Sequence, residues 1–574
     1  MGSEVSSRHN NAAICYLPEA YESGDTRLEL VGRRVAGEAF LKAFTRYADV
    51  DTYYCYTPAS RYFEKFREHV KSLSPSSSAF GWIPWSDATE IAVPGCLYLP
   101  DPVLADHAWT RRWHGQRSYS LCGVTHTTAD KGFMDVVGMY LTGPLQPWDA
   151  LICTSHVVKE TIDKILADWS DYLADRFGTR PTCPVERPVI PLGIEPEDFA
   201  PTDERRQEGL KIRARMGVQP GDIVVLYVGR FSFNGKSNPY PMLVALERAA
   251  GKTGRRIHLV QVGWFNNQAN QDAFVNAARQ LAPSVRSLFV DGRDPAVRRT
   301  IWYAADIFTS LVDNIQETFG LTPLEAMAAG LPVVVTDWNG YRDTVVEGVT
   351  GFRVPTCMPA PGSGEDLAYR YHSAMDTYSD YLTFTSACVA VDIGACEEAY
   401  RRLILDGDLR ARMGQAGRRH VQQHFAWSTV IAAYQELWHE LAQRRQLSDE
   451  AVPHRHGQPV HPLRQDPFTF FAGYPTVLMT DDTPVRLAPN IPMEYVTRLR
   501  HLELFLLSLP ALLPEQETLE LLRRVPEGRS VSVAHLIEGL PRGQHERVRR
   551  TVAWLIKTGV MSLAGPAQTP RAST

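Results

Sequence analysis

Two glutamates flank a short turn past the middle of the chain, in the stretch ETFGLTPLE, residues 317–325. The preceding run, IFTSLVDN, and the following run, LPVVVTD, both have the composition of strands. Glu317 would lie where the first of these strands ends, and a carboxylate there can accept hydrogen bonds from hydroxyl groups. The turn is therefore a candidate site for a hydroxyl-rich ligand.

A structural role competes for one of the two glutamates. Thr322 as N-cap, Pro323 as first helical residue and Glu325 at the third position would form a T-x-x-E capping box. Gly330 would end that helix. Because Glu317 precedes the helix and has no place in this cap, capping accounts for Glu325 and leaves Glu317 to a ligand.

Two cations follow an earlier strand-like run, IVVLYV, in the loop GRFSFNGK, residues 229–236. Gly229 allows a turn, and Arg230 and Lys236 would lie at the strand's carboxyl end, where parallel α/β sheets bind ligands. Helix N-termini at the same edge favour phosphate, and the N–H groups of residues 318–321 could face an anion. An ordinary surface loop would hold the same two cations. Together with the glutamates, they favour a nucleotide sugar, with cations on the diphosphate and carboxylates on hydroxyls.

Strand-like and helical runs alternate in two successive parts of the chain, which predicts βαβ units and parallel sheets. The strands expected in the first part are AAICYL, DTYYCY, GCLYLP, YSLCGVTH, DALICT and RPVIPL. A linker rich in proline and charge follows at residues 191–209. We therefore predict two doubly wound α/β domains, residues 1–195 and 196–445, with a tyrosine-rich insertion at about 358–394.

The remaining residues, 446–574, have a different pattern. Three helices and a short terminal strand predict a mostly helical, winged-helix-like accessory module. Basic residues around its third helix could suit DNA, but Glu546 and apolar positions among them favour a protein partner and make nucleic acid an unfavoured ligand. These basic residues are Arg542, Arg547, Arg549, Arg550 and Lys557.

Composition and cysteine spacing further limit the classes of protein to which this chain could belong. The 574 residues are 44% hydrophobic with a net charge of -5, which disfavours wholesale binding to polyanions. The nine cysteines form no CxxC pair, which predicts a reducing compartment. No apolar run is long enough for a transmembrane segment, so we expect a cytoplasmic protein, or one peripheral at a membrane. Asp49-Val50-Asp51 matches a metal-binding DxD pattern, but it lies at a helix-to-strand junction and is interpreted as a solvated turn.

Taken in order, these motifs resemble family 4 retaining glycosyltransferases of the GT-B fold, the glycosyl transferases group 1. The resemblance is carried by VGRFSFNGK, by ADIFTSLVDNIQETFGLTPLEAMAAGLPVVVTDWNG and by VVEGVTGFRV. It is strong over residues 215–355, fair over 145–200 and 410–442, and absent after about 450. The resemblance implies two Rossmann-like domains facing across a cleft, with acceptor bound in the first and donor in the second.

The resemblance also implies roles for single residues. Arg230 and Lys236 would hold the donor pyrophosphate and stabilise its departure, and Glu317 would contact hydroxyls of the donor sugar. His126, in CGVTHT, would lie near the transferred sugar. Donor-binding positions would further include Glu325, on the ribose, together with Gly229, Thr318, Phe319, Gly320 and Leu321.

The implied activity is retaining transfer of a sugar from a UDP- or GDP-sugar to an acceptor that the sequence leaves open: a glycan, lipid, small molecule or protein. No metal or other cofactor is implied. Two departures from the family pattern limit these implications: Gly24, Gly32 and Gly37 stand isolated where a paired-glycine loop contacting donor or acceptor is usual, and Arg342-Asp343 replaces Pro-Glu. Two alternatives are a sugar-nucleotide epimerase of the same fold and a GT-B-like scaffold whose C-terminal module binds a protein or DNA partner.

Overall fold

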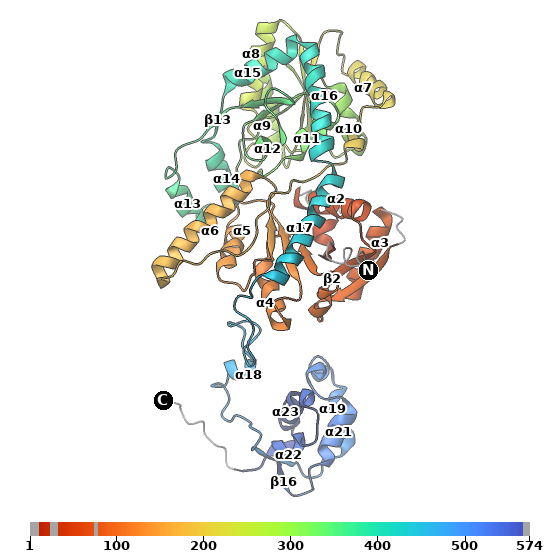
Figure 1. Ribbon diagram of the computed structural model, residues 1–574, viewed down its shortest axis with the longest axis vertical. Coiled ribbons are helices and arrows are strands. Elements are labelled where there is room, and N and C mark those ends of the chain that lie inside the picture. Colours follow the sequence, from red (N-terminus) through yellow and green to blue (C-terminus); the bar gives the residue numbers. More distant parts are fainter. Residues whose placement is uncertain (1–10, 23–31, 74–77, 566–574) are drawn as a thin grey trace. The chain divides into compact units, whose positions relative to one another are not determined.

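The computed structural model describes residues 11–22, 32–73 and 78–565 of the chain. It divides into two compact units, Met1–Val460 and His461–Thr574. The first unit contains two six-stranded parallel sheets with helices packed around them (Figure 1). This arrangement confirms the predicted α/β class with two doubly wound domains.

The first sheet has the strand order β3-β2-β1-β4-β5-β6, and all its pairs are parallel. Its order reverses beside β1, which marks the point where ligands bind in such sheets. The strands are β1 (Ala13–Cys15), β2 (Thr52–Thr57), β3 (Ala79–Pro84), β4 (Cys96–Leu99), β5 (Ser120–Val124) and β6 (Ala150–Ile152). The main helices are α2 (Gly32–Tyr47), α3 (Ser60–Leu73), α4 (Leu104–His114), α5 (Lys131–Gly138) and α6 (His156–Phe177).

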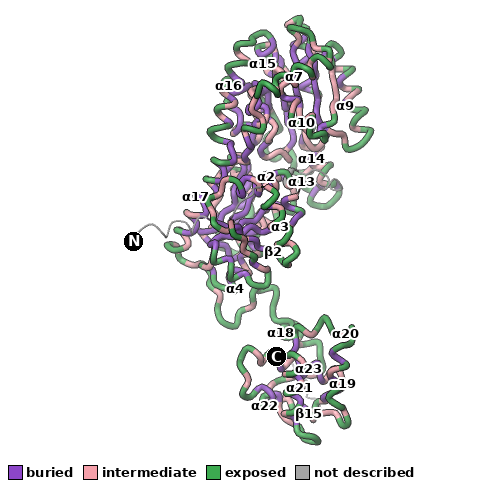
Figure 2. Tube along the Cα trace, turned by 90° about the vertical axis from the view of Figure 1, so that its right-hand side faces the viewer, coloured by how far each residue is buried: buried purple, intermediate pink, exposed green. Residues whose placement is uncertain are grey.

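The second sheet repeats this order as β12-β11-β10-β7-β8-β9, with the reversal between β10 and β7. Its strands are β7 (Ile223–Val228), β8 (Ile257–Gly263), β9 (Arg286–Asp291), β10 (Ile307–Ser310), β11 (Val333–Thr336) and β12 (Gly351–Val354). The helices are α7 (Asp203–Arg215), α8 (Tyr240–Thr253), α9 (Gln268–Leu281), α10 (Pro295–Thr300), α11 (Leu321–Ala328), α12 (Tyr341–Thr344), α15 (Ile393–Leu405) and α16 (Gly407–His424). In Figure 2 the buried segments concentrate in the interior of the first unit, and exposed residues follow the outer turns of the helices.

Three local expectations differ from the structure. The run RPVIPL forms one isolated bridge, between Val189 and Cys153, and no strand. Strand β3, in AFGWIP, was not expected because a glycine and a proline interrupt its apolar pattern. The expected linker at 191–209 already contains the start of α7, because the Thr202 side chain accepts the Arg205 N–H and caps that helix.

The last helix of the first unit, α17 (Trp427–Leu447), returns to the first domain, although its sequence position had assigned it to the second. Tyr434 and Trp438 enter the core beneath α2, where Phe40 lies 5.2 Å from the Tyr434 ring (Figure 1). The two connections between the domains run side by side, since the Trp427 N–H donates to the Ile194 carbonyl at 3.0 Å. Helical spacing shows that α17 has an apolar face, but not which sheet covers it.

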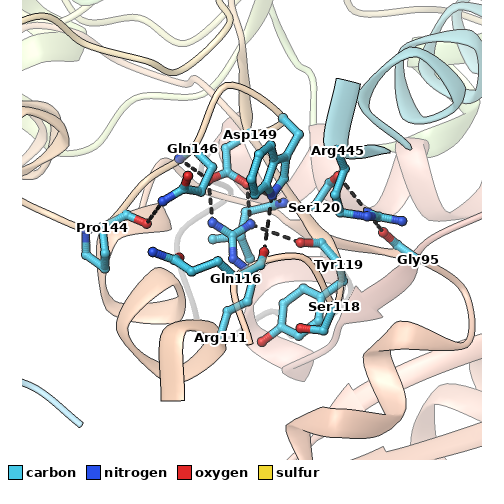
Figure 3. A network of polar contacts seen from close by, with 12 residues as sticks. Gly95, Arg111, Gln116, Ser118, Tyr119, Ser120, Pro144, Gln146, Asp149 and Arg445 are labelled. Carbon is cyan, nitrogen blue, oxygen red and sulfur yellow. Dashed lines mark hydrogen bonds and ion pairs between the residues drawn. The ribbon is translucent and has the colours of Figure 1, made fainter. Parts of the chain in front are cut away.

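A buried ion pair ties α4 to the far edge of the first sheet (Figure 3). Arg111 and Asp149 are both fully buried, and Arg111 Nη2 donates to Asp149 Oδ2 at 2.7 Å. The carboxylate also accepts the N–H groups of Leu121 and Gln146, at 2.9 and 2.8 Å. Gln146 in turn binds Ala451, which follows α17. The network therefore holds the returning chain as well as the sheet.

The second unit has a small antiparallel sheet, β16-β15-β17, and a hydrophobic core of its own. Arg549, one of the predicted basic residues, is committed to ion pairs with Asp481 and Glu546. Across the described parts of the chain, no helix is both long and apolar enough to span a bilayer. The elements of this unit are α18 (Pro467–Phe470), β15 (Pro484–Leu487), α19 (Met493–Arg500), α20 (Glu503–Leu506), α21 (Glu515–Arg523), β16 (Ser530–Ser532), α22 (Val533–Ile537), α23 (Arg542–Lys557) and β17 (Met561–Leu563).

Replacing Asp149 by asparagine is expected to lower the free energy of unfolding by about 3 kcal/mol, because Arg111 would remain buried without a counter-charge. Urea unfolding followed by tryptophan fluorescence measures this loss. The matched control is Asp168→Asn, whose partner Lys164 is mostly exposed and whose loss should cost less than about 1 kcal/mol. Equal midpoints for the two variants would contradict the structural role of Arg111–Asp149.

Candidate functional site

Two loops meet at the strand-order reversal of the second sheet. One, residues 229–239, follows β7, and the other, residues 311–320, follows β10, the strand paired with β7. Arg230 and Lys236 lie in the first loop and Glu317 in the second. The parallel register thus gathers three of the predicted site residues at one edge of one sheet.

Lys236 and Glu317 form an ion pair across these loops, with Lys236 Nζ donating to Glu317 Oε2. Both side chains are largely buried, at 26% and 13% exposure. Burial by itself lowers the pKa of Lys236, but the Glu317 carboxylate more than offsets this effect and raises it. The ammonium group therefore stays charged at neutral pH.

The Glu317 carboxylate also interacts with backbone N–H groups. Burial by itself raises its pKa, but Lys236 and the N–H groups of Phe319 and Thr318 lower the pKa below its usual value. These are two of the N–H groups that the sequence assigned to an incoming anion. In the free protein they face the carboxylate of Glu317, so a bound phosphate would have to compete with it.

The second loop is held in place by its own polar side chains. Asn314 Nδ2 donates to the Asn234 carbonyl at 2.8 Å, which binds the two loops to each other. Asn314 Oδ1 accepts the Gln316 N–H at 2.9 Å, and the Asn314 carbonyl accepts from Trp338 Nε1 at 3.1 Å. Asn339 Nδ2 donates to the carbonyl of Glu317 itself. The position of the glutamate is therefore set from both sides.

Arg230 lies next to this pair. Its positive charge lowers the pKa of Lys236 and of Tyr227, which places the guanidinium close to both side chains. Among the residues that the structure describes, no ion pair to the Arg230 guanidinium is found. Gly229 precedes it, and a Cβ atom there would lie 2.8 Å from the Tyr227 hydroxyl oxygen. The loop thus presents one cation paired to Glu317 and a second cation available to a ligand.

The capping box predicted for Thr322 and Glu325 is wrong. Helix α11 begins two residues earlier than predicted, at Leu321, after Gly320 with φ of 83° and without any side-chain cap. A Cβ atom at Gly320 would lie 2.1 Å from the Tyr341 ring, so only glycine allows this close entry into the helix. The predicted end at Gly330 agrees with the structure: its φ is 87°, and the Leu331 N–H donates to the Ala326 carbonyl at 3.0 Å.

Freed of a capping role, Glu325 lies in the second turn of α11. Burial raises the pKa of its carboxyl to about 7, although Arg298 opposes this. Within the described residues no ion pair involves Glu325. A carboxyl group that is about half protonated at neutral pH and has no charged partner is suited to hydrogen bonding with neutral hydroxyl groups.

Asp313 is a site residue that sequence reasoning missed. It follows β10, is 4% exposed, and its Oδ1 accepts the N–H of Asn238, in the loop before α8, at 3.2 Å. Burial raises its pKa to about 7. The signal available in the sequence was a carboxylate directly after the strand-like run IFTSLV, where buried acids at strand ends are functional candidates.

The first domain reaches the loop that follows β10 at the start of α6, whereas the predicted His126 contacts its own domain. At the start of α6, Ser155 Oγ donates to the Thr318 carbonyl at 3.0 Å, and the His156 N–H donates to Asp343 Oδ2 at 2.7 Å. Asp343, a departure from the family pattern, therefore contacts the first domain. Near the end of β5, His126 Nε2 lies 2.7 Å from the Pro100 carbonyl oxygen.

The glycines after β1 fall on different parts of the chain. Gly24 lies outside the described residues, and Gly32 begins α2. At Gly37 a Cβ atom would lie 2.1 Å from the Ala20 carbonyl oxygen, so this glycine allows α2 to pack on α1 (Pro18–Tyr21). Its role in the structure is close packing. In the described ranges, no group of three or more His, Cys, Asp or Glu side chains is placed to hold a metal ion.

Comparison with known proteins agrees with this architecture. Residues 210–361 match the family described as glycosyl transferases group 1. The chain is 24% identical over 300 residues to a D-inositol 3-phosphate glycosyltransferase of Corynebacterium glutamicum, covering 52% of this chain and 62% of that protein. It is 30% identical over 215 residues to an alpha-monoglucosyldiacylglycerol synthase of Streptococcus pneumoniae, covering 37% and 42%. The chain thus spans less than two thirds of the length of either relative.

Among solved structures, the Anabaena protein Alr3699/HepE in complex with UDP and glucose aligns with a TM-score of 0.43 and 14% identity. The alignment covers 74% of this chain and 98% of that one. The two parallel sheets, each with the strand order of a doubly wound domain, give the chain a GT-B architecture, and within it residues 210–361 match the glycosyl transferases group 1.

Asp313→Asn is expected to change the pH dependence of stability. The folded pKa is about 7, against a usual value of 3.8. Between these values the native state keeps a proton that the unfolded state has released, so the free energy of unfolding falls as pH rises. Asparagine cannot ionise. Between pH 5 and pH 8 the free energy of unfolding of Asp313→Asn, relative to that of wild type, should therefore rise by on the order of 2–3 kcal/mol.

Urea unfolding at pH 5, 6, 7 and 8 measures this difference. Asp272→Asn, at an exposed position on α9, is the control and should follow the wild-type pH profile. Parallel profiles for Asp313→Asn and wild type would show that the Asp313 carboxyl ionises normally in the folded protein.

Proposed function

We propose that this chain transfers a sugar, with retention of configuration, from a UDP- or GDP-sugar to an acceptor bound by the first domain. In this proposal Arg230 and Lys236 bind the diphosphate and stabilise the negative charge that develops as it leaves. Glu317 binds hydroxyl groups of the donor sugar, and Glu325 binds the ribose. The observation that carries the proposal is the Lys236–Glu317 contact beside Arg230, at the strand-order reversal.

The charges of this cluster suit such a donor. The diphosphate of the donor carries about two negative charges. Because Glu317 already binds Lys236, the diphosphate can bind the same ammonium group only by attracting it away from the carboxylate. Arg230 supplies the second cation. Glu317 then keeps the N–H groups of Thr318 and Phe319 and retains free carboxylate lone pairs for sugar hydroxyls. Phosphate and sugar would thus lie on opposite sides of Lys236.

The reaction needs no further group from this cluster. The bond between the anomeric carbon and the diphosphate oxygen breaks, and a bond to the acceptor oxygen forms on the same face of the sugar. The acceptor proton passes to the leaving diphosphate, so charge and atoms balance. His126 borders the transferred sugar from the first domain. We infer that Arg230, Lys236 and the N-terminus of α11 neutralise the leaving group without a divalent metal ion.

Two substitutions should separate the role of the cation from that of the carboxylate. Lys236→Ala is expected to weaken binding of UDP or GDP by roughly 10- to 100-fold, because a charge-assisted hydrogen bond is lost. Glu317→Gln should bind the same nucleotide at least as well as wild type, because Lys236 no longer has a competing carboxylate. It should nevertheless lose sugar transfer. Isothermal titration with UDP and GDP, and nucleotide release from a panel of their sugars, provide the two measurements.

Lys211→Ala, which breaks an exposed pair with Glu208, is the matched control. Unchanged nucleotide binding by Lys236→Ala would contradict the proposed donor site. An equal loss of nucleotide affinity in both site variants would place Glu317 on the nucleotide and not on the sugar.

A further inference from the structure

The tyrosine-rich insertion forms a helical hairpin on the second domain. It leaves the sheet after β13 (Thr356–Cys357) and returns at β14 (Ala390–Val391), which pairs with β13 in antiparallel fashion. Its helices are α13 (Glu365–His372) and α14 (Tyr378–Ser386). In Figure 1 the hairpin lies beside α5 of the first domain, whose first residue, Lys131, contacts Tyr371 of α13.

Internal contacts give the hairpin a defined shape. Arg370 binds Asp376 through two hydrogen bonds of 2.8 and 2.6 Å, which fixes the turn between the helices. Tyr371 stacks on Tyr381 with ring centroids 4.6 Å apart. Thr377 caps α14 in a reciprocal capping box with its third residue. Tyr378, the first residue of α14, is therefore held at a fixed place in the fold.

The hairpin touches the first domain at two tyrosine hydroxyls. The Tyr378 hydroxyl lies 3.3 Å from Thr127 Oγ1, and Thr127 follows His126 directly. The Tyr371 hydroxyl accepts the N–H of Lys131, the first residue of α5, at 3.3 Å. Both contacts bridge the two domains. Only the contact with Thr127 lies next to a residue predicted to contact the substrate, His126.

The same end of α14 touches both donor loops. Asn234 Nδ2 donates to Ser379 Oγ at 3.3 Å, which links α14 to the loop of Lys236. Thr127 hydrogen-bonds the Tyr378 hydroxyl, and Gln316, which directly precedes Glu317, lies close enough to that hydroxyl to lower its pKa. Burial raises the pKa of this hydroxyl, and both neighbours oppose the rise without cancelling it. The phenol is therefore neutral at physiological pH and able to donate as well as accept.

We propose that Tyr378 is a specificity-determining residue that hydrogen-bonds a hydroxyl of the transferred sugar. The inference rests on the proposed function, which places that sugar between Glu317 and His126. The hydroxyl of Tyr378 hydrogen-bonds Thr127, the chain neighbour of His126, and the adjacent Ser379 contacts Asn234 in the loop of Lys236, so a sugar held there would meet Tyr378. A hydroxyl that can donate and accept distinguishes sugars by the orientation of their own hydroxyls.

Tyr378→Phe tests this role, since it removes the hydroxyl and keeps the ring. Affinity for UDP or GDP alone should stay within about twofold of wild type, because the diphosphate site is untouched. The ratio of kcat/KM values between pairs of sugars on the same nucleotide should change by roughly tenfold or more, as expected for loss of one hydrogen bond. Nucleotide release from a panel of sugars measures these ratios.

Tyr371→Phe is the matched control, because it removes the other bridging hydroxyl, which bonds the Lys131 N–H. Its sugar ratios should equal those of wild type. Equal shifts in the two variants would show that the hairpin acts only by bridging the domains, and would overturn the proposal. If Tyr378→Phe binds nucleotide and its kcat/KM ratios between sugars are unchanged, the role proposed for Tyr378 is overturned and the proposed function is not. Failure of the wild type to bind either nucleotide would overturn the proposed function together with this inference.

Discussion

The ion pair between Lys236 and Glu317 is the contact on which the site depends. It joins two loops whose residues lie 81 positions apart in the chain, and each largely buried charge compensates the other. The surrounding amides of Asn314 and Asn339 then serve to hold Glu317 in reach of Lys236. An anion that enters the site would have to replace part of the negative charge with which Glu317 neutralises Lys236. In the free protein Glu317 thus occupies the position, relative to Lys236, that a diphosphate would take.

Segments remote in sequence connect the two domains around that pair. Helix α17 leaves the second domain and completes the aromatic core of the first, where the Arg111–Asp149 network also holds the chain that follows it. On the other side, α14 reaches Thr127 through Tyr378. The start of α6 meets Thr318 and Asp343. The candidate site is therefore bordered by contacts from both domains, and its geometry depends on how the domains are held together.

The fold was largely predictable because alternation of apolar strands and amphipathic helices constrains a parallel α/β sheet strongly. Most strands were found where IVVLYV, IFTSLV and similar runs placed them. Errors arose where local signals were weak or ambiguous. The glycine and proline of AFGWIP obscured an edge strand, and the apolar face of α17 was compatible with either sheet. The T-x-x-E pattern suggested a cap at Thr322, but the positive φ of Gly320 starts the helix at Leu321.

For the site, the sequence by itself determined which chemical groups follow which strands: two cations after β7, and carboxylates after β10 and within α11. Parallel strands order their carboxyl ends along one edge, so those groups had to be near one another. Only the tertiary structure decided their partners. It paired Lys236 with Glu317, left Glu325 without a counter-ion, buried Asp313 and brought Tyr378 from the insertion to Gln316. Such pairings follow from packing and desolvation in the folded state, which local sequence patterns do not encode.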